Sequence, residues 1–469
     1  MSVGDDSRSQ IVNESTGAAE ALPLVSRVSC PHCWEQYPPE ESMWISSDHP
    51  TLAGDPKLGP EEPRRFKAER FNVQGIALDG REERAAGLAC PNCHLEVPRV
   101  LYEYRPFFVS IVGAPGSGKS FFLPAMTWFL RSQMPEKFAV NFQDADPRLN
   151  IRLHQYEETL FLNTDREKVV TLEKTRVQGM ENLYDSVMIG GDVVEFPRPF
   201  VFRMEPTPDH PGRSKVSTVA RAVCMYDNAG ESFAAAASGR ESRLTNHLEH
   251  CDLTLFLFDP TQHPRFRERA KAVSKDPQWN HTRENAVLQN TILDNAAARL
   301  RNLRGLSLQE RFSGPLVVVV TKLDAWANLI PEDVRNPLLA ADYTPRSTVD
   351  SRACVLRADL VQQLSKTIRG LLRTLAPEIV AAADGFSTDV TYIPVSATGC
   401  VVRPMENVAA NGIKDARKID GAAEGASVVF GVRPRNMNPK WCELPLLYGL
   451  SQAKVPLLRT AAAKPAGGV

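Results

Sequence analysis

The sequence predicts an α/β fold in which a mostly parallel, six-stranded sheet is flanked by helices and preceded by a small cysteine-bearing module. Three observations predict it. Short apolar runs alternate with helical patterns from residue 105 onward, a glycine-rich turn follows the first run, and two Cys-x-x-Cys pairs lie upstream. Alternation of this kind favours a parallel sheet, because each parallel connection needs a crossover that is usually helical.

The composition is that of a folded chain. It has 469 residues, of which 43% are apolar and 24% charged, so it can bury a sizeable core. The formal net charge of -1 gives no sign of a nucleic-acid or anionic-membrane partner. No apolar run approaches the roughly 18 residues of a membrane span, and the first twenty residues lack the blocks of a secretion signal. We expect a cytoplasmic location.

Six strands and two long helices are expected. The strands are 107–112, 200–204, 222–227, 253–259, 315–321 and 390–396. Apolar residues at three- and four-residue steps predict helices over 288–303 and 356–375, the first of them capped by Gly305.

Four segments are expected along the chain. They are a disordered tail at 1–25, the cysteine module with an insertion at 26–104, the α/β domain at 105–455 and a disordered tail at 456–469. Two long intervals within the α/β domain fit no compact element, and we expect loops or insertions there. These intervals are 130–195 and 406–427.

The glycine-rich turn "GAPGSGKS" matches the phosphate-loop pattern G-x-x-x-x-G-K-[ST] and lies between an apolar strand and a helix-compatible stretch. Its backbone N–H groups can point at phosphate oxygens. Lys119 is expected to bridge the β- and γ-phosphates, and Ser120 to ligate Mg²⁺. The expected phosphate-binding residues are Gly113, Ala114, Pro115, Gly116, Ser117, Gly118, Lys119, Ser120 and Phe121.

The strand over 222–227 ends in a second phosphate-directed pattern, D-x-x-G. Asp227 can hold Mg²⁺ through water, and the backbone N–H of Gly230 can reach the γ-phosphate. A hydrogen bond to the γ-phosphate exists only with the triphosphate, so this segment can sense hydrolysis.

Two later strand ends are suited to a purine base. After the strand over 315–321, Asp324 can accept hydrogen bonds from N1–H and the 2-amino group of guanine, which adenine lacks, and the stem of Lys322 can lie along the base. Thr321 begins this motif. At the last strand the backbone N–H of Ala397, after Ser396, can meet guanine O6. A polar turn after a strand, as in any α/β protein, is the alternative for the segment with Asp324 when it is taken alone.

Together the four motifs, in this order and each at a strand end, resemble the P-loop GTPases of the translation-factor-related (TRAFAC) class over roughly residues 105–400. The details "YDNAGE" and "LFDPTQ", with Cys-x-x-Cys pairs upstream, look like the bacterial double-GTPase families, which are predicted to act in conflict or defence operons. The resemblance implies a Mg²⁺-dependent switch that hydrolyses GTP to GDP and phosphate. It also implies a nucleotide-dependent dimer and partner proteins encoded nearby, such as a second GTPase or an effector.

Several residues depart from the family's pattern or complete it. Thr321 stands where asparagine is commoner and is expected to lose part of the bridge to the phosphate loop. Glu231 replaces a water-orienting glutamine, so slow hydrolysis is expected without a partner. Thr175 is the candidate Mg²⁺ ligand of the first switch, although an ordinary loop threonine fits equally well. Arg240 and Arg243 are candidates for an arginine in cis, although solvated charges are the commoner case.

The two cysteine pairs, "SCPHCWEQ" and "ACPNCHLE", are near-copies of a zinc knuckle, and two knuckles make a tetrahedral Cys₄ site. The 56 residues between the pairs (34–89) far exceed the usual ribbon spacing of roughly 15 to 20, which an inserted lobe would explain. Redox pairs and separate metal sites are the alternatives, and His32 and His94 could substitute as ligands. The expected zinc ligands are Cys30, Cys33, Cys90 and Cys93.

The residues thus predict a slow GTPase, with two alternatives left open. One is a nucleotide-sensing scaffold that hydrolyses little or nothing, which Glu231 favours. The other is an ATPase of the general P-loop class. The choice between guanine and adenine depends on Asp324.

Overall fold

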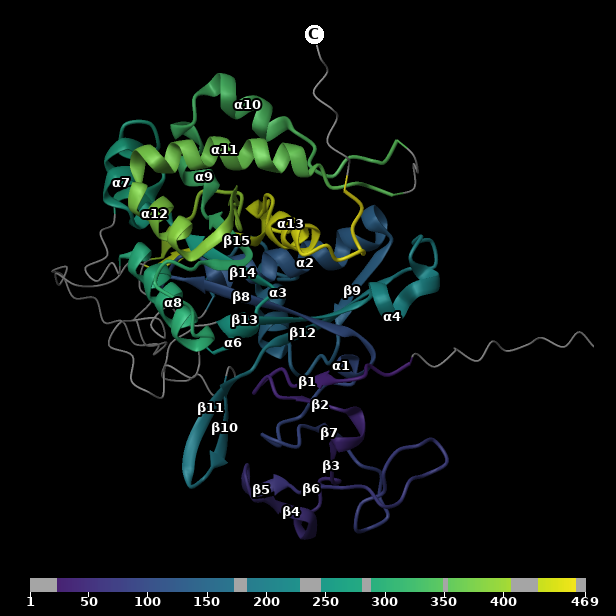
Figure 1. The fold of residues 1–469 in the computed structure, drawn as a ribbon. Coiled ribbons are helices and arrows are strands. Elements are labelled where there is room, and N and C mark those ends of the chain that lie inside the picture. Colours follow the sequence, from purple (N-terminus) through teal and green to yellow (C-terminus); the bar gives the residue numbers. More distant parts are fainter. Residues whose placement is uncertain are drawn as a thin grey trace, which may run out of the picture.

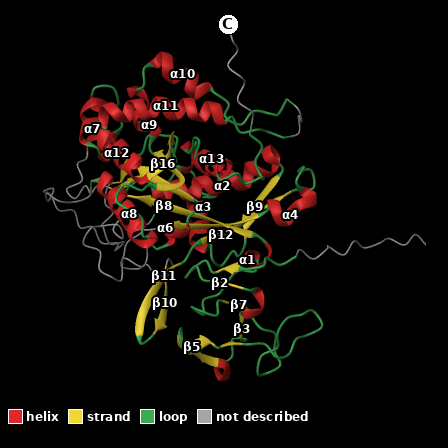
Figure 2. Ribbon diagram, viewed as in Figure 1, coloured by secondary structure: helices red, strands yellow, loops and turns green. Residues whose placement is uncertain are grey.

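The structure is a computed structural model that describes residues 23–172, 184–227, 246–280, 288–348, 353–405 and 429–460. A central sheet crosses the molecule, with most of the helices above it and the purple-to-blue N-terminal segment below it (Figure 1). Figure 2 shows the same division, with short strands and loops dominating the N-terminal part.

The central sheet has seven strands in the order β16-β15-β14-β8-β13-β12-β9. Neighbours from β16 to β13 are parallel, and β12 is antiparallel to both of its neighbours, so the sheet is mixed. The strands are β8 (Arg105–Gly113), β9 (Val140–Asp144), β12 (Phe200–Pro206), β13 (Arg221–Asp227), β14 (Leu253–Phe258), β15 (Phe312–Val320) and β16 (Ser387–Pro394).

All six predicted strands are present, but the predicted number is wrong by one. The seventh strand, β9, lies within the interval 130–195, for which the sequence predicts loops. Its five residues carry a short apolar signal, Val140 and Phe142, and pairing with β12 at the sheet edge makes it a strand. The same interval holds the end of α2 (Lys119–Phe138), α3 (Ile151–Phe161) and part of the hairpin β10 (Tyr184–Ile189) and β11 (Asp192–Pro197). The interval 406–427 lies outside the described residues.

Both predicted helices form. The first is α8 (Gln289–Arg304), and Gly305 follows it in the left-handed conformation with φ 63°. The second is α11 (Ala358–Leu375). The others are α1 (Val100–Glu103), α4 (Val216–Val219), α6 (His247–His250), α7 (Pro264–Lys271), α9 (Leu323–Trp326), α10 (Glu332–Ala340), α12 (Pro377–Phe386) and α13 (Leu444–Gln452). Among the described residues, none of the helices combines the length and apolar character that crossing a bilayer requires.

Residues 456–460, which the sequence prediction assigns to a disordered tail, are described and belong to the fold. Leu457 is buried in the main core. The backbone N–H of Leu356, ahead of α11, donates to the carbonyl of Arg459 at 2.8 Å. Ahead of this segment, β17 (Arg403–Met405) pairs antiparallel with β18 (Val429–Gly431).

The cysteine module packs against one face of the central sheet. On β13, Val223 and Met225 belong to the main core, whereas Ala222, Cys224 and Tyr226 are buried together with module residues such as Trp34. This alternation is the two-residue period of a strand with both faces covered. The module therefore covers part of the sheet face opposite the main core.

Small antiparallel sheets build the module itself. Strands β1 and β2 form a hairpin, β6, β3 and β7 form a three-stranded sheet, and β4 pairs with β5. The long interval between the cysteine pairs is therefore a folded lobe, as an insertion would be. The strands are β1 (Val28–Ser29), β2 (Gln36–Tyr37), β3 (Met43–Ile45), β4 (Ala53–Asp55), β5 (Gly59–Pro63), β6 (Arg65–Phe66) and β7 (Gly87–Ala89).

Candidate functional site

The glycine-rich turn joins the end of β8 to the start of α2, as a phosphate loop must. Gly116 and Gly118 have φ of 72° and 99°, which side chains rarely adopt. A Cβ on Gly113 would lie 2.8 Å from Ser117 Oγ and 2.9 Å from the carbonyl oxygen of Leu257 on β14. The turn is therefore packed tightly against the next strand, and its first glycine has no room for a methyl group.

Lys119 is bound to this turn, and its charge acts on Asp227 at the end of β13. Lys119 is buried and its Nζ donates to the Gly113 carbonyl at 2.7 Å. Burial raises the pKa of the Asp227 carboxyl, and the positive charges of Lys119 and Arg152 offset this only in part. A buried carboxylate beside a lysine at a strand end is suited to a metal-bound phosphate.

Two buried polar atoms of this region have no hydrogen-bond partner among the described residues. They are Asp227 Oδ1 and Ser117 Oγ. Buried polar atoms are nearly always paired in folded proteins, so these two atoms are available to a ligand. The residues present thus fit Mg²⁺ at Asp227 and phosphate at the loop.

Thr321 links the base motif to the phosphate loop. Its hydroxyl lies 2.9 Å from the Ser117 carbonyl and 3.1 Å from the Phe258 carbonyl. The bridge expected to be weakened by the shorter side chain is therefore present as a hydroxyl hydrogen bond. It connects residues 204 positions apart in the chain.

Lys322 is held by Asp259 and Thr261, to which the sequence patterns assign no role. Its backbone is left-handed at φ 58°, and its Nζ lies 2.6 Å from Asp259 Oδ2 and 3.0 Å from Thr261 Oγ1. Asp259 is fully buried at the end of β14. Burial alone would raise its pKa, but the adjacent ammonium and hydrogen bonds lower it below the usual value. The "LFDPTQ" segment carries a family resemblance in the sequence, whereas this ion pair depends on tertiary contact.

Asp324 and Ser396 are brought together by the pairing of β15 with β16. The Ser396 hydroxyl donates to Asp324 Oδ1 and accepts from the Gly399 N–H at 2.8 Å. Burial raises the pKa of Asp324 to about 6, aided by the charge of Asp276, while the Ser396 hydrogen bond opposes the shift. Ala397 is half-buried beside this pair. The predicted base residues therefore form one cluster.

Other predicted residues cannot be placed. The Mg²⁺ candidate Thr175, the loop residues Gly230 and Glu231, and the arginines Arg240 and Arg243 lie outside the described residues. For these five, the sequence predictions stay as they are.

The four knuckle cysteines converge on a single point. Their sulfur atoms all lie within 4.8 Å of one another, with Cys30 to Cys93 and Cys33 to Cys90 both at 3.7 Å, and none forms a disulfide. Four thiolates at about 2.3 Å from one ion would lie about 3.8 Å apart, so the residues fit tetrahedral zinc. Among the described residues this is the one His/Cys/Asp/Glu cluster with metal-site geometry.

The two knuckles have matching backbone hydrogen bonds. The N–H of His32 points at Cys30 Sγ and that of Asn92 at Cys90 Sγ, both at 3.4 Å. Such N–H groups stabilise thiolates. Trp34 and His94 occupy equivalent left-handed positions, with φ of 58° and 64°.

The neighbouring histidines have other partners. His32 Nε2 lies 3.1 Å from the carbonyl of Glu96, and His94 Nδ1 lies 2.9 Å from Asp55 Oδ2. Neither belongs to the cysteine cluster. Both histidines instead make hydrogen bonds to groups outside the cluster.

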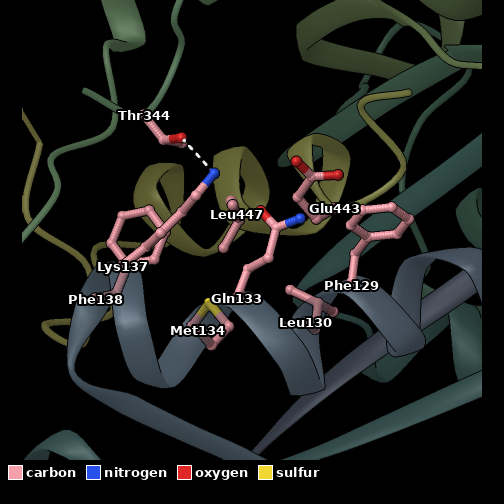
Figure 3. A pocket seen from close by; sticks show the side chains of 9 residues that line it. All are labelled: Phe129, Leu130, Gln133, Met134, Lys137, Phe138, Thr344, Glu443 and Leu447. Carbon is pink, nitrogen blue, oxygen red and sulfur yellow. Dashed lines mark hydrogen bonds between the residues drawn. The ribbon is translucent and has the colours of Figure 1, made fainter. Parts of the chain in front are cut away.

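A small pocket between α2 and α13 is separate from this site (Figure 3). It is lined by Phe129, Leu130, Gln133, Met134, Lys137, Phe138, Thr344, Glu443 and Leu447. None of these belongs to the phosphate loop, the base motif or the cysteine cluster. Lys137 donates to Thr344 Oγ1 at 3.3 Å across its rim.

No protein-family model and no curated protein matches this chain. Solved structures that it is similar to include Sup35 complexed with GDP, at 14% identity and a TM-score of 0.20, covering 63% of this chain and 38% of that one. The elongation factor SelB from Methanococcus maripaludis with the GTP analogue GppNHp matches at 11% identity and 0.19, covering 63% and 30%.

A third is the signal recognition particle receptor SRβ-GTP/SRX complex from Chaetomium thermophilum, at 14% identity and a TM-score of 0.23, covering 63% of this chain and 92% of that one. The chain thus spans well under half of Sup35 and SelB.

Proposed function

We propose that this chain is a guanine-nucleotide switch that binds GTP with Mg²⁺ and hydrolyses it slowly to GDP and phosphate. One observation carries the proposal. Three features lie where parallel strands end, at one edge of the sheet, and this edge is where α/β folds bind their ligands. They are the phosphate loop, the Asp227 oxygen that has no partner in the described structure, and the Asp324–Ser396 pair.

The phosphate half of the site acts by position and charge. Backbone N–H groups of the turn and the first turn of α2 face the phosphates, and the helix dipole adds to their field. Lys119 leaves the Gly113 carbonyl to bridge the β- and γ-phosphates. Water attacks the γ-phosphate, the bond to the β-phosphate oxygen breaks, and GDP and inorganic phosphate leave.

Ser120 and Asp227 would hold Mg²⁺, which neutralises phosphate charge when bound. Asp227 is buried and no described residue pairs with its Oδ1, so a cation there would satisfy this oxygen and favour the charged carboxylate. The four cysteines would hold zinc as a structural ion. Four thiolates leave no open position, so we assign this ion no step in hydrolysis.

The base half would select guanine. An ionised Asp324 accepts from N1–H and the 2-amino group, and adenine has neither donor at those positions. Sites that hydrogen-bond a substrate reject analogues lacking those groups because their buried polar atoms are left unpaired. Asp259 would hold Lys322 so that its alkyl stem lies along the base.

Phosphate release from purified protein tests the proposal, with Lys119→Ala as the inactive variant and Lys137→Ala as its control. Lys137 lies on the same helix and contacts the separate pocket. We expect slow release from GTP that Lys119→Ala lowers by about 100-fold or more and Lys137→Ala leaves unchanged. Tight GTP binding without release would favour the nucleotide-sensing scaffold, the rival that Glu231 supports.

Competition between GTP and ATP tests the base. GTP should win in the wild type, and Asp324→Asn should remove most of that preference. A preference for ATP would make the chain a P-loop ATPase instead. The TRAFAC assignment, a role in bacterial defence, a nucleotide-dependent dimer and a partner such as a second GTPase or an effector extend this proposal on the sequence resemblance alone.

A further inference from the structure

We propose that Tyr226 is a positioning residue through which the cysteine module sets the place of Asp227, so that zinc and magnesium–nucleotide occupancy are linked. The inference rests on the proposed function and concerns the regulation of the same site. Its basis is a set of contacts between the first knuckle and the last residues of strand β13.

The Tyr226 hydroxyl makes hydrogen bonds to both ends of the first knuckle. It donates to the Pro31 carbonyl at 2.6 Å and accepts from the Trp34 indole N–H at 3.1 Å. Pro31 follows Cys30, and Trp34 follows Cys33, so the hydroxyl contacts both ends of the loop that carries two ligands. Tyr226 is only 1% exposed. Its hydroxyl has no other role apparent in the described structure.

Aromatic rings fix the Tyr226 ring on several sides. Its centroid lies 5.0 Å from that of His247, 6.1 Å from Trp34 and 6.2 Å from Phe108. His247 in turn makes a 2.8 Å hydrogen bond with Ser110 Oγ on β8, three residues before Gly113. A displacement of the first knuckle would therefore displace the Tyr226 side chain as well.

Tyr226 and Asp227 are consecutive on β13 and so lie on opposite faces of the sheet. Tyr226 is buried with the module. The Asp227 carboxyl is influenced by the charges of Lys119 and Arg152. Since no described residue hydrogen-bonds its Oδ1, the backbone set by Tyr226 governs where this oxygen is presented to a cation.

The linkage has a definite sign. Zinc orders the knuckle, the knuckle holds Tyr226, and Asp227 is then pre-positioned for Mg²⁺. By reciprocity, bound magnesium–nucleotide must hold zinc more tightly by the same factor. Coupling between sites is typically about 5- to 150-fold in affinity. We expect the low end, because one side chain carries it.

Equilibrium competition for zinc with a chromogenic chelator measures this linkage in the full-length protein. Adding GDP with Mg²⁺ should raise the zinc affinity of the wild type by about fivefold. In Tyr226→Phe, which removes the hydroxyl and keeps the ring, GDP should have almost no effect. Tyr37→Phe is the matched control. Tyr37 is 2% exposed, and its hydroxyl lies 3.2 Å from that of Tyr102 inside the module, so this variant should behave as the wild type.

A second readout separates positioning from general loosening. Tyr226→Phe should raise the Mg²⁺ concentration that half-saturates GDP retention by several-fold, with little change in GDP affinity in EDTA. A loss in EDTA as large as that in Mg²⁺ would indicate structural damage and overturn the positioning role. The wild-type comparison with and without GDP tests the linkage even if a variant does not fold.

The outcomes also separate the two proposals. If the wild type binds GDP and its zinc affinity is unchanged, the linkage is wrong and the switch proposal stands. If the wild type binds no guanine nucleotide, the proposed function fails first.

Discussion

The cysteine cluster and the proposed nucleotide site lie on opposite sides of strand β13, and they are built in opposite ways. The cluster is closed. Its four sulfur atoms face one another, and backbone N–H groups two residues after Cys30 and Cys90 support them. The nucleotide site is open. It is collected from separate strand ends, and Asp227 Oδ1 and Ser117 Oγ find no partner in the part of the chain that the structure describes.

We interpret this difference as that between a structural metal site and a site for an exchangeable ligand. A closed ligand set uses its binding free energy to order the module. An open site keeps buried polar atoms available for a ligand that comes and goes. If the contrast holds, removing a cysteine should damage folding, whereas changes at the nucleotide site should alter affinity and leave the fold standing.

The largest expected effect comes from Cys90→Ser. Zinc binding can supply about 10 kcal/mol or more to a small module, so losing a ligand should abolish the zinc and unfold this segment. Zinc content and limited proteolysis of residues 26–104 measure it. Cys354→Ser changes a buried cysteine outside the cluster and should keep full zinc. A full zinc complement in Cys90→Ser would contradict a closed site that needs all four cysteines.

Gly113→Ala should come next. The added methyl would meet Ser117 Oγ and the Leu257 carbonyl at 2.8 and 2.9 Å, and overpacking of this kind costs about 1–3 kcal/mol. We expect the free energy of unfolding to fall by that amount and GTP affinity to fall with it. Gly370→Ala is the control, because it is exposed within α11 with open space around its Cβ. Thermal unfolding should show it to be neutral or stabilising by about 1 kcal/mol.

Acidification should weaken guanine binding through Asp324. Its pKa is about 6 in the free protein because of burial and Asp276, and the base requires the ionised carboxylate. Lowering the pH from about 7.5 to about 5 should therefore reduce affinity by roughly tenfold. Fluorescent GDP titrations measure this. Asp324→Asn should show a flatter profile, and equal slopes would assign the pH dependence to the phosphates instead.

The smallest expected effect is that of Thr321→Val. The change keeps the shape and removes the hydroxyl that lies 2.9 Å from the Ser117 carbonyl. One neutral hydrogen bond contributes about 1 kcal/mol, so nucleotide should dissociate about five times faster. Stopped-flow release of fluorescent GDP measures it, with Thr321→Ser retaining the hydroxyl as the control. An unchanged GDP dissociation rate in Thr321→Val would show that this hydrogen bond does not hold the phosphate loop in place.

Much of the core could be predicted because its signals are local. Runs such as "PLVVVV" are long and apolar enough to indicate buried strands, and the spacing of leucines before Gly305 marks a helix and its end. The sequence did not predict strand β9, because its five residues carry little apolar signal of their own. It becomes a strand through pairing with β12.

The sequence by itself determined the chemistry available to this chain: a phosphate-loop turn, two knuckles with four thiols, and carboxylates placed after apolar strands. These are short-range patterns, in which neighbouring residues constrain one another's backbone. Only the tertiary structure decided which distant groups meet. Asp259 with Lys322, Thr321 with Ser117, and Tyr226 with the first knuckle all depend on contacts across 63 to 204 residues. Strand pairing and packing create such contacts, and no local pattern records them.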